Sequence, residues 1–155
     1  MSKTPKQILL IEDNHLEAGE VQERLKLDLS GFELSFTVCA TEQEFREKLA
    51  GSGLGSLDLA IIDIILPWAA LAPDMPPMPA DVKEGGNARA GIRCKKMLLE
   101  NEATKAVPII LYSYLDEGAL SAPEVDGAKF VSKMSDPAEL VAEVRKRLTS
   151  DLSPI

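Results

Sequence analysis

The chain has 155 residues, of which 45% are hydrophobic and 27% are charged. This composition excludes a disordered or low-complexity protein, and the length predicts one domain over residues 1–155. The formal net charge of −8 argues against direct binding of nucleic acid, because contacts to phosphate need a basic surface.

The apolar runs are too short for a membrane helix or a signal-peptide core. The longest, 8–11 and 64–66, are far below the roughly 20 residues that a bilayer requires. Cys39, Cys94 and the single histidine, His15, are too few for a disulfide framework or a usual zinc site. We therefore expect a soluble cytoplasmic protein without membrane contacts, in which both cysteines are small core residues.

The first part of the chain alternates strand and helix patterns. Residues 8–11 are continuously apolar, which is typical of a strand buried on both faces. An approximately helical spacing of leucines and valine over 16–29 follows, and residues 34–38 then alternate apolar and polar side chains as a second strand would. A capping-box signature at 41–44 begins a second helix, and 57–63 is predicted to be a third strand.

The second part continues the alternation. Apolar spacing predicts a helix within 92–102, strands over 107–112 and 129–132, and a last helix with Asp136 as N-cap and Pro137 at its first position. Five apolar strands separated by helices predict an α/β fold, with a parallel sheet covered on both faces.

Two stretches interrupt this pattern. Residues 68–90 contain four prolines and two glycines, so we expect a long inserted loop between the third strand and the third helix. The helix expected over 117–127 should be short or mobile, because Gly118, Pro123 and Gly127 weaken it.

Polar residues lie where the predicted strands end. Glu12 and Asp13 follow the first strand, and Asp63 closes the third. Ser113 follows the fourth strand and Lys133 the fifth. Ligands of open α/β sheets bind beyond the carboxyl ends of the strands, so a strand order of 2-1-3-4-5 brings these residues into one crevice. Carboxylates there repel by about 4 kcal/mol per pair at 4 Å and an effective dielectric near 20, and oxygen ligands without His or Cys favour Mg²⁺ as the compensating cation.

Most of these residues also have an ordinary structural explanation. Glu12 or Asp13 alone fits a solvated loop acid or a helix cap equally well. Asp63 is harder to explain in this way, because it interrupts the largely apolar stretch 60–67 and a buried carboxylate needs a partner. His15 follows the acid pair, and a surface position is a better interpretation for it than a ligand.

The constellation resembles the receiver domain of bacterial response regulators. The matching segments are ILLIEDN over 8–14, LAIIDIILP over 59–67, PIILYS over 108–113 and GAKFVSK over 127–133. The likeness covers nearly the whole chain outside the insert. It implies a flavodoxin-like, doubly wound five-stranded parallel sheet of order 2-1-3-4-5 with helices on both faces.

The resemblance also implies a metal-dependent phosphoacceptor. Asp63 would take a phosphoryl group from the phosphohistidine of a sensor histidine kinase or a histidine phosphotransfer protein. Glu12 and Asp13, together with Asp63 and the backbone carbonyl of Ile65, would hold Mg²⁺. The domain would be a signalling module rather than an enzyme, although it assists its own phosphorylation and dephosphorylation.

Two further residues complete the implied switch. Lys133 would pair with one phosphoryl oxygen, and the Ser113 hydroxyl would move to bond another. Phe130 would then follow into the space that Ser113 vacates. Ordinary core packing explains Phe130 equally well.

The resemblance sets expectations for partners too. Residues 149–155 are too short for an output domain, so we expect a single-domain regulator that acts on a downstream protein target, unless the chain is a fragment of a longer regulator. A homodimer through the face of the fourth strand and the fifth helix is a further expected contact.

Some positions depart from the family pattern. Tyr114 stands where a small residue is usual, so its ring would crowd the phosphoryl site or shield it from water. Met134 replaces the usual proline after the lysine, and the apolar Ile65 and Leu115 would slow hydrolysis. The insert 68–90 would fold over the crevice, contact a partner or remain a surface loop.

The main alternative is a pseudo-receiver, an interaction module that is not phosphorylated. Tyr114, Met134 and the insert favour it, whereas the five filled polar positions argue against it. A phosphatase of the haloacid-dehalogenase type needs an aspartate where Ile65 stands. A flavodoxin is disfavoured because the acids at 12–13 would repel a phosphate.

Overall fold

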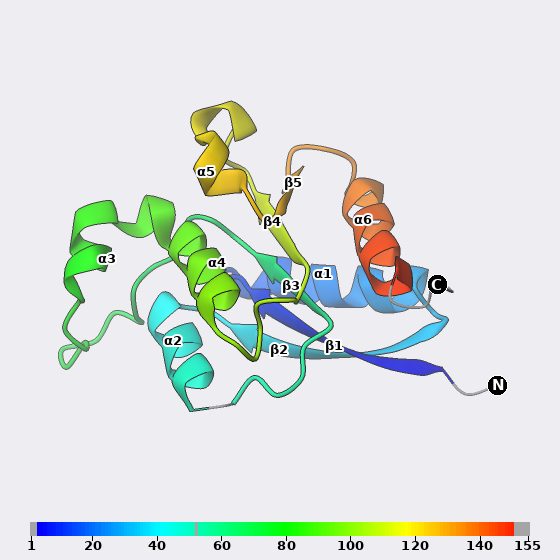
Figure 1. The fold of residues 1–155 in the computed structure, drawn as a ribbon, viewed down its shortest axis with the longest axis horizontal. Coiled ribbons are helices and arrows are strands. Elements are labelled where there is room, and N and C mark those ends of the chain that lie inside the picture. The colour runs from blue at the N-terminus through cyan, green and yellow to red at the C-terminus, as the bar shows by residue number, and fades with distance from the viewer. Residues whose placement is uncertain (1–2, 52, 151–155) are drawn as a thin grey trace.

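The computed structural model describes residues 3–51 and 53–150, which form a five-stranded parallel sheet with helices on both faces (Figure 1). The C-terminal segment 151–155, part of the tail considered too short for an output domain, lies outside the described residues. The strands are β1 (Thr4–Ile11), β2 (Phe32–Cys39), β3 (Leu59–Ile62), β4 (Ile109–Ser113) and β5 (Lys129–Ser132). Their order, β2-β1-β3-β4-β5, confirms the predicted fold class and topology.

Helices cover the sheet in two layers. The α-helices are α1 (His15–Asp28), α2 (Glu42–Ala50), α3 (Ala80–Gly85), α4 (Ala90–Glu100), α5 (Ala122–Val125) and α6 (Pro137–Ser150), and η1 (Asn87–Arg89) and η2 (Glu117–Ala119) are 3₁₀ turns. Helices α1 and α6 lie on one face, and α2, α4 and α5 lie on the other (Figure 1). No helix within the described residues is both long enough and apolar enough to cross a membrane.

The continuous apolar run of β1 contributes side chains to the hydrophobic cores on both faces of the sheet. Successive side chains of a strand point to opposite faces, so Leu9 and Ile11 pack on the side of α2 and α4, while Ile8 and Leu10 pack on the side of α1 and α6. All four are 2% exposed or less. This explains why the strand carries no alternation of polar residues.

The N-cap of α1 sets the rotation of that helix. The Asn14 side chain accepts hydrogen bonds from the amides of Leu16 and Glu17, at 3.0 and 3.1 Å. In this register Ala18 and Leu25 are buried, whereas Leu16 is 78% exposed. The prediction that Leu16 begins the apolar face of the helix is therefore wrong.

The helix expected over 117–127 is short. It is reduced to η2 and the four-residue α5, which begins with a capping box between Ser121 and Glu124. The chain leaves α5 through Gly127, whose φ of 82° lies in the left-handed region that glycine tolerates best.

The insert 68–90 has more structure than the proline pattern indicated. The prolines exclude a helix only up to Pro79. Pro79 is the N-cap of α3, and η1 follows α3. Trp68 and Val82 are buried in a small hydrophobic cluster of the insert, with Met75 packed against them. The insert thus contains two short helices and a cluster of its own.

A buried carboxylate fastens this insert to α2 and α4. Glu42 has no exposed surface and accepts hydrogen bonds from Arg46 at 2.8 Å and from two nitrogens of Arg93 at 2.7 and 2.8 Å. Arg46 also binds Asp81 of α3 at 2.8 Å, and its guanidinium lies 5.4 Å from the centre of the Trp68 ring. These contacts hold the insert against the α2–α4 side of the molecule.

Replacement of Glu42 by alanine should destabilise the protein and loosen the insert. Arg93 would lose its buried counter-charge, so we expect the free energy of unfolding to fall by about 3 kcal/mol. The only tryptophan, Trp68, reports on the insert, and its emission should shift to longer wavelength. Urea unfolding followed by fluorescence measures both effects. Glu47→Ala, at an exposed position of the same helix, is the control. Equal losses of unfolding free energy in the two variants would contradict the stabilising role of the Glu42–arginine contacts.

Candidate functional site

Backbone hydrogen bonds between neighbouring strand ends place the polar residues at one edge of the sheet. The amide of Asp63 donates to the carbonyl of Ile11 at 3.0 Å, directly before Glu12. The amide of Lys133 donates to the carbonyl of Ser113 at 2.9 Å. Because β1 adjoins β3 and β4 lies between β3 and β5, the side chains that follow β1, β3 and β5 emerge at the same edge of the sheet. In the chain, 121 residues separate Glu12 from Lys133.

Three carboxylates meet at this edge. One oxygen each of Glu12, Asp13 and Asp63 lies within 4.8 Å of the other two. Glu12 and Asp63 are 4% and 8% exposed, whereas Asp13 is open to solvent. Oxygen donors without nitrogen or sulfur suit a hard divalent cation, so the triad could hold Mg²⁺ or Mn²⁺.

The ammonium of Lys133 lies among the acids. Its Nζ is 2.5 Å from Glu12 Oε1, 2.8 Å from Asp63 Oδ2 and 3.4 Å from Glu17 Oε2, and its side chain is only 4% exposed. Burial alone would lower the pKa of Lys133, but the hydrogen bonds to Asp63 and Glu12 and the charges of these two groups outweigh it. The pKa is therefore raised, and the lysine remains charged.

Glu12 is the acid whose protonation this environment changes most clearly. Burial raises the pKa of Glu12 to about 7, and the negative charge of Asp63 acts in the same direction. The hydrogen bonds from Lys133 and from the amide of Asn14 oppose the rise. Near neutral pH the site can therefore exchange a proton, and a divalent cation must compete with that proton.

Ser113 is the last residue of β4, and Phe130 lies on β5. Ser113 is 1% exposed, and its hydroxyl accepts a hydrogen bond from the Leu115 amide at 3.2 Å. In the described part of the chain it has no hydrogen bond to Asp63. Phe130 is 8% exposed and belongs to the core on the α2–α4 side. The structure thus brings together Glu12, Asp63 and Lys133, with Ser113 on the adjoining strand.

The loop after Asp63 is held by the first turn of α4. The amide of Gly91 donates to the carbonyl of Ile64 at 2.8 Å. A Cβ atom on Gly91 would lie 2.2 Å from the Asp63 carbonyl oxygen and 2.6 Å from the Ile64 Cα. Only glycine permits this approach. Ile65, on the same loop, is 45% exposed, and its amide donates to Asp63 Oδ1 at 3.3 Å.

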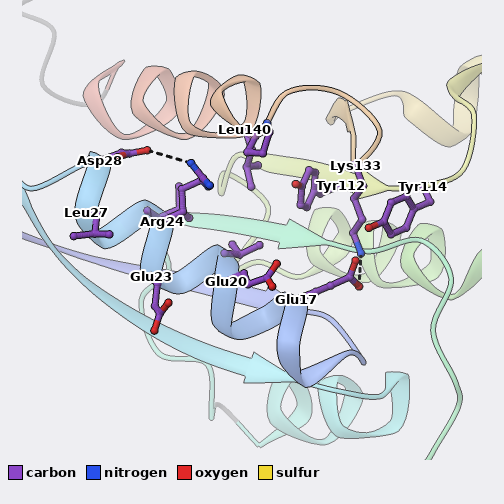
Figure 2. A pocket seen from close by; sticks show the side chains of 13 residues that line it. Glu17, Glu20, Glu23, Arg24, Leu27, Asp28, Tyr112, Tyr114, Lys133 and Leu140 are labelled. Atoms are coloured by element: carbon purple, nitrogen blue, oxygen red, sulfur yellow. Dashed lines mark hydrogen bonds and ion pairs between the residues drawn. The ribbon is translucent and has the colours of Figure 1, made fainter.

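Sequence reasoning did not assign Glu17 or Tyr112 to the site. Both line a cavity of about 400 Å³ beside α1, together with Tyr114 and Lys133 (Figure 2). The centres of the Tyr112 and Tyr114 rings lie 5.7 and 5.1 Å from Lys133 Nζ. The one available signal was the helix cap at Asn14, which places Glu17 in the first turn, above the strand ends.

Solved structures of receiver domains share this fold. The structure is similar to a signal receiver domain of two-component signal transduction (histidine kinase) from Clostridium thermocellum, with a TM-score of 0.68 and 17% identity over 92% of this chain and 97% of that one. It is similar to the receiver domain of the Francisella response regulator 1452, with a TM-score of 0.65 and 18% identity over 94% and 98% of the two chains. It is also similar to the Mn²⁺-bound form of response regulator Rcp1, with a TM-score of 0.64 and 18% identity over 97% of each chain.

A scan against protein-family models finds no match, and a search of curated proteins finds none. At identities below 20%, the structural matches establish the fold. The chain therefore has the fold of a response-regulator receiver domain, as its motifs predicted.

Binding of Mn²⁺ should weaken as the pH falls through about 7. Protonation of Glu12, whose pKa is raised to about 7, removes one negatively charged ligand from the triad. Titration calorimetry at pH values below and above 7 measures the change in the Kd for Mn²⁺. Glu12→Gln should bind weakly with little pH dependence over this range, and an unchanged pH profile in that variant would contradict the assignment to Glu12.

Substitution of Gly91 by alanine should displace the loop that carries Asp63. The new Cβ overlaps backbone atoms, so we expect a loss of about 2 kcal/mol in the free energy of unfolding. Gly19→Ala is the matched control, because a Cβ there meets no atom within 4 Å and a helical alanine should stabilise α1 by about 0.5 to 1 kcal/mol. Equal melting temperatures for the two variants would refute the proposed close approach.

Proposed function

We propose that the chain is a phosphoacceptor receiver of a two-component His–Asp phosphorelay, organised as one domain over residues 1–155 with an insert at 68–90. The observation that carries the proposal is the contact of 2.8 Å between the Lys133 ammonium and Asp63, beside the triad of carboxylates. A buried lysine and clustered acids supply the charges that phosphoryl transfer needs, because this reaction depends mainly on positioning and electrostatic stabilisation.

In this proposal Asp63 is the nucleophile. A carboxylate oxygen attacks the phosphorus of a phosphohistidine, a P–O bond forms, and the P–N bond to the histidine breaks. Glu12, Asp13 and Asp63, with the backbone carbonyl of Ile65, would hold Mg²⁺, which neutralises charge on the phosphoryl oxygens. The structurally similar response regulator Rcp1 has been solved in a Mn²⁺-bound form, which supports a divalent cation as the proposed ligand.

Lys133 and Ser113 would bind the transferred group. The ammonium of Lys133 would exchange one of its carboxylate acceptors for a phosphoryl oxygen. The Ser113 hydroxyl would release the Leu115 amide and donate to another oxygen, and Phe130 would follow. Because Phe130 is already part of the core, ordinary packing remains the competing explanation for this residue.

The proposed partners are those of two-component signalling, the system named for a structurally similar receiver domain. A sensor histidine kinase or a histidine phosphotransfer protein would donate the phosphoryl group in the cytoplasm, and a downstream protein would receive the signal. Homodimerisation through the face of the fourth strand and the last helix is the remaining proposed contact. The net charge of −8 favours protein partners over nucleic acid.

A pseudo-receiver is the second candidate. The Tyr114 ring lies 5.1 Å from the Lys133 ammonium, which is already surrounded by carboxylates. Such a site is compatible with a permanently satisfied ion-pair network that accepts no phosphate. The two candidates differ in one measurable property, the covalent modification of Asp63.

Intact mass after incubation with acetyl phosphate and Mg²⁺ tests the proposal. We expect the wild-type chain to gain one phosphoryl group, and chelation of the metal should abolish the gain. Asp63→Asn should gain none, whereas Asp28→Asn, at the exposed end of α1, should react like the wild type. Absence of modification in the wild type would favour the pseudo-receiver, and modification of Asp63→Asn would contradict the assignment of Asp63 as the acceptor.

A further inference from the structure

Lys133 has more carboxylate partners than the proposed reaction uses. Its ammonium has three protons, and acceptors from Glu12, Asp63 and Glu17 surround it. Glu12 and Asp63 belong to the acidic triad, whereas Glu17 is outside it. The Glu17 contact is the longest of the three, and its side chain is the most exposed, at 26%. It is therefore the contact that Lys133 would give up most readily.

The start of α1 places Glu17 beside Lys133. Its amide donates to the Asn14 side chain at 3.1 Å, which fixes its position in the first turn of α1. Figure 2 shows Glu17 and Tyr114 converging on the Lys133 ammonium from α1 and from the segment after β4. A hydrogen bond to Glu17, together with the negative charge of that carboxylate, raises the pKa of the Tyr114 hydroxyl.

We propose that Glu17 is a restraining positioning residue that holds back Lys133 and thereby slows phosphorylation of Asp63. The inference rests on the proposed function and deepens it. Glu17 acts in two ways: it competes with the incoming phosphoryl oxygens for a proton of Lys133, and its negative charge repels an anionic phosphodonor. The cavity that Glu17 and Tyr114 line opens beside the same ammonium.

The inference predicts opposite effects on two ligands. Removal of the Glu17 charge should speed reaction with an anionic donor and, at the same time, weaken binding of a divalent cation to the nearby triad. Damage to the fold would weaken both. The signs of the two effects therefore distinguish a restraining charge from a structural role.

The test uses Glu17→Gln, which keeps the shape of the side chain and removes its charge. We expect the rate of Asp63 phosphorylation by acetyl phosphate to rise about fivefold, and the Kd for Mn²⁺ to rise about twofold. Glu23→Gln removes the same charge two turns further along α1 and should change either value less than twofold.

The outcomes separate this inference from the proposed function. If the wild type reacts and Glu17→Gln reacts no faster than Glu23→Gln, the restraint is refuted while the phosphoacceptor function stands. If Glu17→Gln loses both reactivity and Mn²⁺ affinity, Glu17 is structural and the inference is wrong. If neither wild type nor variant is modified, the proposed function and this inference fail together.

Discussion

The ion pairing of Lys133 is the interaction on which the rest of the site depends. Parallel strands deliver Glu12 and Asp63 to the same sheet edge, and both carboxylates are almost completely withdrawn from solvent. Buried like charges at this spacing need a cation nearby. The Lys133 ammonium is this cation. Its charge does not fully offset the burial of Glu12, because burial still raises the pKa of Glu12 to about 7. Protons, the Lys133 ammonium and a divalent cation would therefore compete for the same carboxylates.

Glu42, away from this site, is also a buried carboxylate, and its surroundings have a different physical character. Glu42 accepts hydrogen bonds from two nitrogens of Arg93 and from one nitrogen of Arg46. The guanidinium groups of the arginines are planar, rigid and always charged. Lys133 is instead a compact point charge that can change partners by rotating its ammonium. The arginine clamp therefore suits a permanent structural role, and the lysine site suits exchange of ligands.

The two centres are joined by a short stretch of backbone. The loop after Asp63 bonds to Gly91 of α4, the Leu66 amide donates to Asn87 of η1, and the carbonyl of Trp68 accepts from the amide of Gln43. Backbone hydrogen bonds therefore connect the insert to the loop that follows Asp63. Its attachment to α2 and α4 makes it part of the framework that positions Asp63.

The strands and the polar residues at their ends could be predicted from the apolar runs, because parallel strands buried on both faces carry continuous apolar side chains and end at a common edge. The strand order was implied only by the resemblance to receiver domains. Neither the pattern nor the resemblance identified all the side chains that surround Lys133. Glu17 reaches the site only because the Asn14 cap fixes the rotation of α1, which also leaves Leu16 in solvent. Gly91 approaches Asp63, and Glu42 clasps two arginines, only once the helices pack. Periodicity is a local property of the chain, whereas these contacts depend on how separate helices and strands pack against one another in the folded protein.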